Sequence, residues 1–181
     1  MASFEVLSVD LAKLERAVGS RDSALVQTIA QDEDPPELRD AMRAILVEGR
    51  RPFRGDSYSL ARVTLRMGRV LGRRINGNTC DLLSQEALDR VAAVETSLRL
   101  GVRFEELLAT DVVPIAGLPI DEEMRFGVIS ADRIRAGFAE WSRARPADAD
   151  DDDADGICAE MLDWLEVASL RGESLVGVFW P

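Results

Sequence analysis

The chain has 181 residues, of which 46% are hydrophobic and 30% charged, as expected for a globular protein with a core of its own. Its formal net charge of −11 repels polyanions at long range and argues against a general nucleic-acid binder. The absence of histidine excludes Ser-His-Asp and Cys-His catalytic sets, and two cysteines are too few for a disulfide framework.

The first part of the chain alternates a strand with helices whose ends carry capping and breaking residues. Asp10 and Ser20 can each accept hydrogen bonds from the first turn of a helix, and Gly19 and Gly49 suit helix C-termini. Pro36 fits the first turn of a third helix. These signals predict a strand over 4–9, helices over 10–19, 20–31 and 36–49, and a basic loop over 50–55.

The helix predicted from about Ser57 to Ile75 is the clearest periodic segment of the chain. Apolar residues recur on one side of it at helical spacing. The opposite side carries a stripe of arginines, which we call the arginine face: Arg62, Arg66, Arg69 and Arg73. Residues 39–74 hold ten arginines against three acids, so positive charge is concentrated here in an otherwise acidic protein.

The second half of the chain predicts further helices and two strands. Ser84 and Ser130 are placed to cap helices, and the last segment, 174–180, is apolar on both faces and therefore typical of a buried strand. The predicted elements are helices over 84–100, 104–109, 130–145 and 156–172, and strands over 124–129 and 174–180.

Together these elements predict an α+β fold. We expect a single, mostly helical domain over 1–181, with a small sheet formed by the N-terminal, late-middle and C-terminal strands. The last strand fits either a central place in that sheet or pairing across a homodimer, and the sequence leaves both open.

An acidic segment over 146–155 is interpreted as a flexible linker or loop within the domain. Its residues Asp151, Asp153 and Asp155 match the start of a calcium-binding loop, but Leu162 stands where that motif needs a bidentate glutamate. We therefore assign no metal site, although the sequence leaves open whether the run from Asp148 to Asp155 binds a divalent cation.

Other candidate catalytic groups are weak. The adjacent acids at 105–106 and 121–123 are interpreted as solvated carboxylates, and Cys80 and Cys158 as structural thiols. Lys13 is the only lysine, on what reads as an ordinary helix surface. We assign no catalytic residue and no cofactor.

The expected location is the cytoplasm. No apolar run approaches the roughly 18 residues that a membrane span needs. The first residues also lack the basic head and apolar stretch of a signal peptide.

The arginine face admits three interpretations: a solvated helix surface, a docking surface for an acidic protein, or a site for a phosphorylated or nucleotide ligand. Arginine favours bidentate contacts with carboxylates and phosphates. Tyr58 is the only aromatic residue of this helix, whereas single-stranded nucleic-acid surfaces interleave several. We expect a non-catalytic cytoplasmic module that binds an acidic protein, of an immunity-like or regulatory kind. The alternative is an enzyme or binder whose phosphorylated or nucleotide ligand is held by the same arginines.

Three segments also carry a family resemblance. They are Val9-Asp10-Leu11-Ala12-Lys13-Leu14 with Gly19-Ser20, then Phe126-Gly127-Val128-Ile129-Ser130, and finally Trp164-Leu165 through Gly172 to Phe179. In these the chain resembles small uncharacterised actinobacterial proteins, and its wider arrangement is similar to YfbM-like α+β proteins, in which a strand-then-helix opening recurs late in the chain. The resemblance implies a fold, and it implies no activity, cofactor or catalytic residue.

Overall fold

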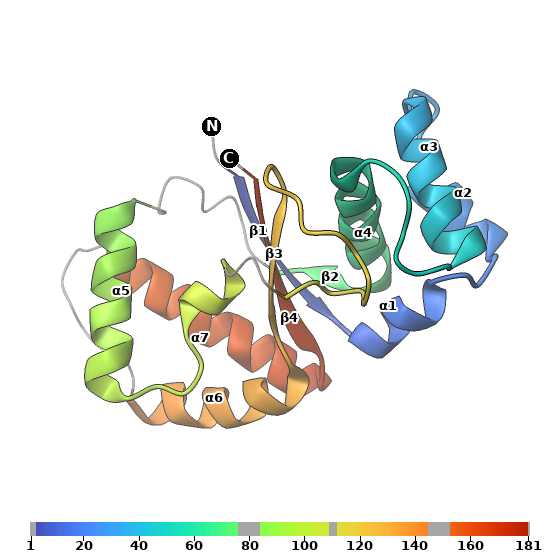
Figure 1. Cartoon of the computed structure of the whole chain (residues 1–181). Coiled ribbons are helices and arrows are strands. Elements are labelled where there is room, and N and C mark those ends of the chain that lie inside the picture. Colours follow the sequence, from blue (N-terminus) through green and yellow to red (C-terminus); the bar gives the residue numbers. More distant parts are fainter. Residues whose placement is uncertain (1–2, 76–83, 109–111, 145–152, 181) are drawn as a thin grey trace.

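The centre of the molecule is an antiparallel sheet of strand order β2-β1-β4-β3 (Figure 1). The computed structural model describes residues 3–75, 84–108, 112–144 and 153–180. Its strands are β1 (Ser3–Val9), β2 (Arg73–Arg74), β3 (Arg125–Ile129) and β4 (Ser174–Trp180). The sheet therefore joins N-terminal, late-middle and C-terminal strands, which confirms the predicted α+β fold.

Strand β4 is a central strand of the sheet. It pairs with β1 from Ser3↔Trp180 to Val9↔Ser174, and on its other edge with β3 from Arg125↔Phe179 to Ile129↔Leu175. Because neighbours cover both edges and helices cover both faces, its continuous apolar sequence is accounted for.

Helices from the N-terminal half of the chain cover one face of the sheet (Figure 1). Alternate strand residues point to this side, among them Leu7 of β1 and Val176 of β4, and they form a first hydrophobic core. The elements of this layer are α1 (Leu11–Ala17), α2 (Ser23–Ile29), α3 (Pro36–Met42), η1 (Arg43–Glu48) and α4 (Ser57–Leu71).

The other face is covered by later helices, with a second hydrophobic core beneath them (Figure 1). The rings of Phe4, Phe104 and Trp164 lie at its centre, with centroids 5.7 to 6.2 Å apart. The elements of this layer are α5 (Gln85–Leu98), η3 (Phe104–Leu107), α6 (Ala131–Ala144) and α7 (Asp153–Arg171).

The short helix η3 rests directly on the sheet backbone at a pair of glycines. Gly127 and Gly177 are cross-strand partners in β3 and β4. A Cβ atom at Gly177 would lie 2.1 Å from the carbonyl oxygen of Leu107, and one at Gly127 would lie 2.2 Å from that of Glu106. Only glycine therefore allows η3 to approach this closely.

Element η1 is a π-helical turn that continues α3, and the sequence did not predict it. Beside it the backbones of Gly19 and Gly49, both with positive φ, are in contact, since a Cβ at Gly49 would lie 2.8 Å from the Cα of Gly19. The N–H groups of Gly19 and Arg21 donate to the carbonyls of Ile45 and Leu46 at 2.8 and 2.9 Å. The widened turn thus finds partners outside its own helix for carbonyls that an α-helix would use internally.

Helix boundaries differ from the prediction at both ends. Helix α2 is capped by Asp22 rather than Ser20, because the carboxylate of Asp22 accepts from Ala24 and Leu25. Helix α5 ends at Leu98 rather than at residue 100, because the next residue, Arg99, adopts a left-handed backbone conformation.

Two longer helices also have boundaries that differ from the prediction. Helix α4 ends at Leu71 rather than Ile75, since Arg73 and Arg74 leave the helix to pair with β1 as strand β2. Helix α7 begins at Asp153, inside the segment predicted as a linker over 146–155. The rest of that segment, the predicted turn at 76–78 and Cys80 lie outside the described residues. Among the residues described, no helix is both long and apolar enough to cross a membrane.

Candidate functional site

Helix α4, which carries most of the arginine face, is enclosed more fully than an amphipathic surface helix. It contacts β1 on one side and α1, α2 and α3 on others. Its buried residues go beyond the predicted apolar side and are Ser59, Leu60, Ala61, Val63, Thr64, Leu65, Met67 and Gly68. Arginines on this helix therefore meet other parts of the chain before they meet solvent.

Arg66 forms a bidentate ion pair with Asp34, in the connection between α2 and α3. Its Nη1 and Nη2 atoms lie 2.8 Å from Oδ2 and Oδ1, and the two side chains are only 13% and 3% exposed. The same guanidinium donates to the carbonyl of Ile29 at 3.0 Å and to Oε1 of Gln31 at 3.1 Å. These bonds hold the pKa of Asp34 below its ordinary value and fix the end of α2 to α4.

Arg69 is engaged by Glu5, whose side chain is 2% exposed in β1. Its Nε and Nη2 atoms donate to Oε1 and Oε2 at 2.9 and 2.5 Å. The hydrogen bonds to the carboxylate raise the pKa of Arg69 above its already high ordinary value. This pair ties α4 to the sheet, just as Arg66 ties it to α2.

The other two arginines lie apart. The Arg62 guanidinium stacks over the Tyr58 ring at 5.7 Å, whereas Arg73 is exposed in β2, where its backbone pairs with Ser8. The prediction of four arginines on one helix is therefore wrong, because the helix ends before Arg73.

Sequence reasoning missed the two acidic partners. Glu5 had a signal, because it falls on the same side of an apolar strand as Leu7 and Val9. Asp34 precedes two prolines in an acidic stretch and shows no pattern that separates it from its neighbours Asp32 and Glu33.

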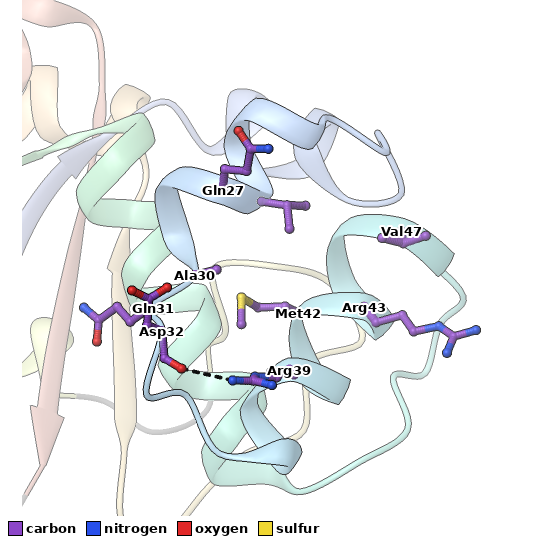
Figure 2. A pocket seen from close by; sticks show the side chains of 9 residues that line it. Gln27, Ala30, Gln31, Asp32, Arg39, Met42, Arg43 and Val47 are labelled. Atoms are coloured by element: carbon purple, nitrogen blue, oxygen red, sulfur yellow. Dashed lines mark hydrogen bonds between the residues drawn. The ribbon is translucent and has the colours of Figure 1, made fainter.

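A groove lies between α2 and the α3–η1 segment, and we call it the α2/η1 groove (Figure 2). Its volume is about 480 Å³, within the range of roughly 300 to 1,000 Å³ of ligand pockets. Figure 2 shows Met42 lying between the helices. The lining residues are Val26, Gln27, Ala30, Gln31, Asp32, Arg39, Met42, Arg43 and Val47.

The groove combines an apolar surface with a charged rim. Val26, Met42 and Val47 line it, and Val47 is 37% exposed. At the rim, Arg39 donates to the backbone carbonyl of Asp32 at 3.1 Å, and Arg43 points away from the helices (Figure 2). The apolar depression therefore carries Arg39 and Asp32 at its rim, and Arg43 extends outward beside it.

One residue of the arginine face, Arg66, supports a wall of this groove. Gln31 lines the groove, and its side chain also accepts from Arg66 of α4. The backbone N–H of Gln31 in turn donates to Asp34 Oδ2 at 2.8 Å. Arg66 and Asp34 thus position one wall of the groove without themselves lining it.

The basic loop predicted over 50–55 forms a second cavity, of about 370 Å³, against the other side of η1. Arg51 is anchored there, since it pairs with Glu15 and lies 5.9 Å from the Phe53 ring. Arg50 and Arg54 are exposed, and the structure gives them no ion pair in its described part. Positive charge is therefore present on both sides of η1.

Two of the acids considered for catalysis, Glu106 and Asp121, have structural partners. Glu106 accepts from the Arg103 backbone N–H at 2.9 Å and pairs with Arg133. Asp121 accepts from the Ser57 hydroxyl at 2.6 Å. Within the described ranges there is no group of three or more His, Cys, Asp or Glu residues that could hold a metal, and most of the calcium-like run falls outside them.

Comparison with known proteins identifies a family. A family model described as a domain of unknown function (DUF7691) covers residues 2–180. No curated protein and no solved structure matches the chain. The comparisons therefore show a family, and its description assigns no chemistry to the site.

Proposed function

We propose that this chain, which belongs to the DUF7691 family, is a non-catalytic cytoplasmic binding module that takes an acidic amphipathic helix of another protein into the α2/η1 groove. The observation that carries the proposal is the groove itself, with apolar walls left open between two helices and arginines at its rim (Figure 2). The proposal keeps the protein-binding function expected from the sequence and moves its site away from the arginine face.

The chemistry of the groove favours a helical partner. An amphipathic helix places apolar side chains in a groove and leaves polar ones at the rim. Val26, Met42 and Val47 would receive the apolar side chains, while Arg39 and Arg43 would meet carboxylates of the partner. The ion pair that Arg43 makes with Glu48, at 3.2 Å, joins side chains that are 71% and 48% exposed, so exchanging it for a partner carboxylate costs little.

The ion pairs of α4 argue against docking through the arginine face. Arg66 and Arg69 are each held by a nearly buried carboxylate, so a partner would have to replace two bidentate pairs within the fold. The structural role of these arginines is sufficient to explain their spacing.

A phosphorylated ligand is the second candidate, and the cavity beside η1 is the observation in its favour. Arg50 and Arg54 flank the anchored Arg51 there, and three guanidinium groups suit a phosphate. Glu48 lines the same cavity and would repel it, so we place this candidate second.

Site-specific photo-crosslinking tests the proposal. A photoreactive phenylalanine analogue replaces Val47 in the groove or, as a matched control, Leu170, which is 80% exposed on α7 across the sheet. In native cells we expect a discrete adduct with a second protein from position 47 and none from position 170. Mass spectrometry of that adduct should identify an acidic amphipathic helix at the cross-link.

Charge reversal completes the experiment. Arg43→Glu should reduce the adduct by about tenfold, because a rim contact with a carboxylate becomes repulsive. Equal adducts from both positions, or a cross-linked peptide that is basic or extended, would contradict the proposal. The double variant Arg50→Ala, Arg54→Ala tests the phosphate alternative. Phosphate binding in the cavity beside η1 requires these two residues, whereas helix binding in the α2/η1 groove does not.

A further inference from the structure

A small crevice lies between α5 and η3, on the face of the sheet opposite the α2/η1 groove. Its volume is about 170 Å³, close to that of an apolar cavity of about 150 Å³ known to accept benzene. The lining residues are Gln85, Leu88, Asp89, Val91, Ala92, Glu95, Phe104, Glu105 and Leu108.

The unusual member of this lining is Glu95, which is only 1% exposed. Its Oε1 atom accepts from the backbone N–H of Phe104 at 2.6 Å. Its Oε2 atom receives no hydrogen bond from the part of the chain that the structure describes. Because buried polar atoms are nearly always paired, a carboxyl oxygen left without a donor calls for an explanation.

The surroundings of Glu95 disfavour anions and offer an apolar slot. Leu88, Val91 and Phe104 supply apolar walls, whereas Asp89 and Glu105 add negative charge. The guanidinium of Arg103, whose charge acts on Glu95, lies 3.6 Å from Glu105 and is shared with it.

Burial raises the pKa of Glu95 to about 7, against the opposing effect of the hydrogen bond from the Phe104 backbone; the charges of Glu105 and Glu106 raise it further and that of Arg103 lowers it. The carboxyl is therefore poised to ionise at neutral pH if a cation arrives.

From this geometry we propose that the crevice binds a small primary ammonium with a short apolar body, whose –NH₃⁺ group donates to the free Oε2 of Glu95. An ammonium group supplies the missing donor and the compensating charge. The alkyl or aryl body fills the volume between Leu88, Val91 and Phe104. The acids of the rim attract the cation and exclude phosphates and carboxylates. The site is separate from the α2/η1 groove, and neither proposal depends on the other.

Binding is linked to proton release, because only the ionised carboxylate pairs with the ammonium. With a Glu95 pKa of about 7, the ionised fraction rises about tenfold between pH values of about 6 and 8. The apparent affinity should rise by the same factor, and calorimetric heats should depend on the ionisation enthalpy of the buffer.

Titration with n-butylammonium chloride tests the inference, with n-butanol as the neutral isostere. Binding is followed by calorimetry and by the ¹H–¹⁵N resonance of Phe104, whose N–H reports directly on Glu95. We expect saturable binding of the amine, a shift of the Phe104 resonance, and binding of n-butanol at least about tenfold weaker.

Two variants of the intact chain distinguish amine binding at Glu95 from a general attraction of cations to the acidic protein. Glu95→Gln keeps the shape and the acceptor for Phe104, and it should weaken amine binding by about 10- to 100-fold. The rim variant Asp89→Asn should change it by less than about threefold. Equal binding to wild type and Glu95→Gln, or no saturable binding to wild type, would overturn the inference. If Glu95→Gln does not fold, the tenfold pH dependence of the wild type decides it.

Discussion

Replacing Asp34 by asparagine removes the charge that holds Arg66 while leaving the side-chain shape nearly unchanged. Arg66 would then be left 13% exposed, with a carbonyl and two amide side chains in place of a carboxylate. Removing one partner of a buried ion pair costs about 3 to 5 kcal/mol, and the partial exposure of Arg66 places the expected loss near about 3 kcal/mol. That is a large share of the roughly 5 to 15 kcal/mol that stabilises a typical domain.

Urea denaturation followed by far-UV circular dichroism measures this loss. With a slope of about 2 kcal/mol/M, the midpoint should fall by about 1.5 M. Because the pKa of Asp34 is lowered in the fold, the contribution of the pair is fully present at neutral pH and is lost as the pH falls through that lowered value. The difference between wild type and Asp34→Asn should therefore shrink in acid.

Two control variants show whether the loss of stability comes from the Asp34–Arg66 pair. Glu86→Gln breaks the exposed pair with Arg90 and should cost less than about 0.5 kcal/mol. Replacing both partners, as Asp34→Leu with Arg66→Met, should recover much of the loss, because no buried charge is left unpaired. If Asp34→Asn is as stable as Glu86→Gln at neutral pH, Arg66 does not hold the α2–α3 connection in the way described.

Three further variants test other parts of the structure. Gly177→Ala should lower the stability by about 1 to 3 kcal/mol, because the new Cβ forces η3 away from the sheet. Gly156→Ala is its control and should cause no loss of stability, because its Cβ meets open space in α7. Thermal unfolding compares the two variants. Glu95→Gln should be more stable than wild type at a pH of about 8, by up to about 3 kcal/mol. The reason is that the raised pKa of Glu95 makes the stability of the wild type fall as the pH rises from about 4.5 to about 7. Urea midpoints of the two proteins that differ equally at all pH values would count against this. Asp56→Ala removes the cap that accepts from Ser59 at 2.7 Å and should cost about 1 kcal/mol in the same assay.

Local patterns in the sequence predicted the elements well. The apolar run 174–180 predicted a buried strand, and β4 lies between β1 and β3. Asp10, Pro36, Gly49 and Ser84 each stand at the predicted helix end, because caps and breakers act within one turn.

The candidate site could not be predicted in the same way. The periodicity of Arg62, Arg66 and Arg69 correctly indicated one helical side, but the partners of Arg66 and Arg69 lie 32 and 64 positions away. No local pattern carries that information. The π-helical turn η1 likewise depends on the contact between Gly19 and Gly49, which only the folded chain brings together.

On the proposal above, Arg66 of α4 supports one wall of the α2/η1 groove through Gln31, and the groove, not the arginine face, binds the partner. Two variants test this: Val47→Asp, which changes the groove, and Arg62→Ala, which changes the arginine face. Arg62 stacks on Tyr58 and does not pair with Asp34 or Glu5. The measurement is the affinity of each variant for the partner captured through position 47. We expect a loss of at least about tenfold for Val47→Asp and no change for Arg62→Ala. The reverse result, with binding lost in Arg62→Ala and kept in Val47→Asp, would contradict it and return the site to the arginine face.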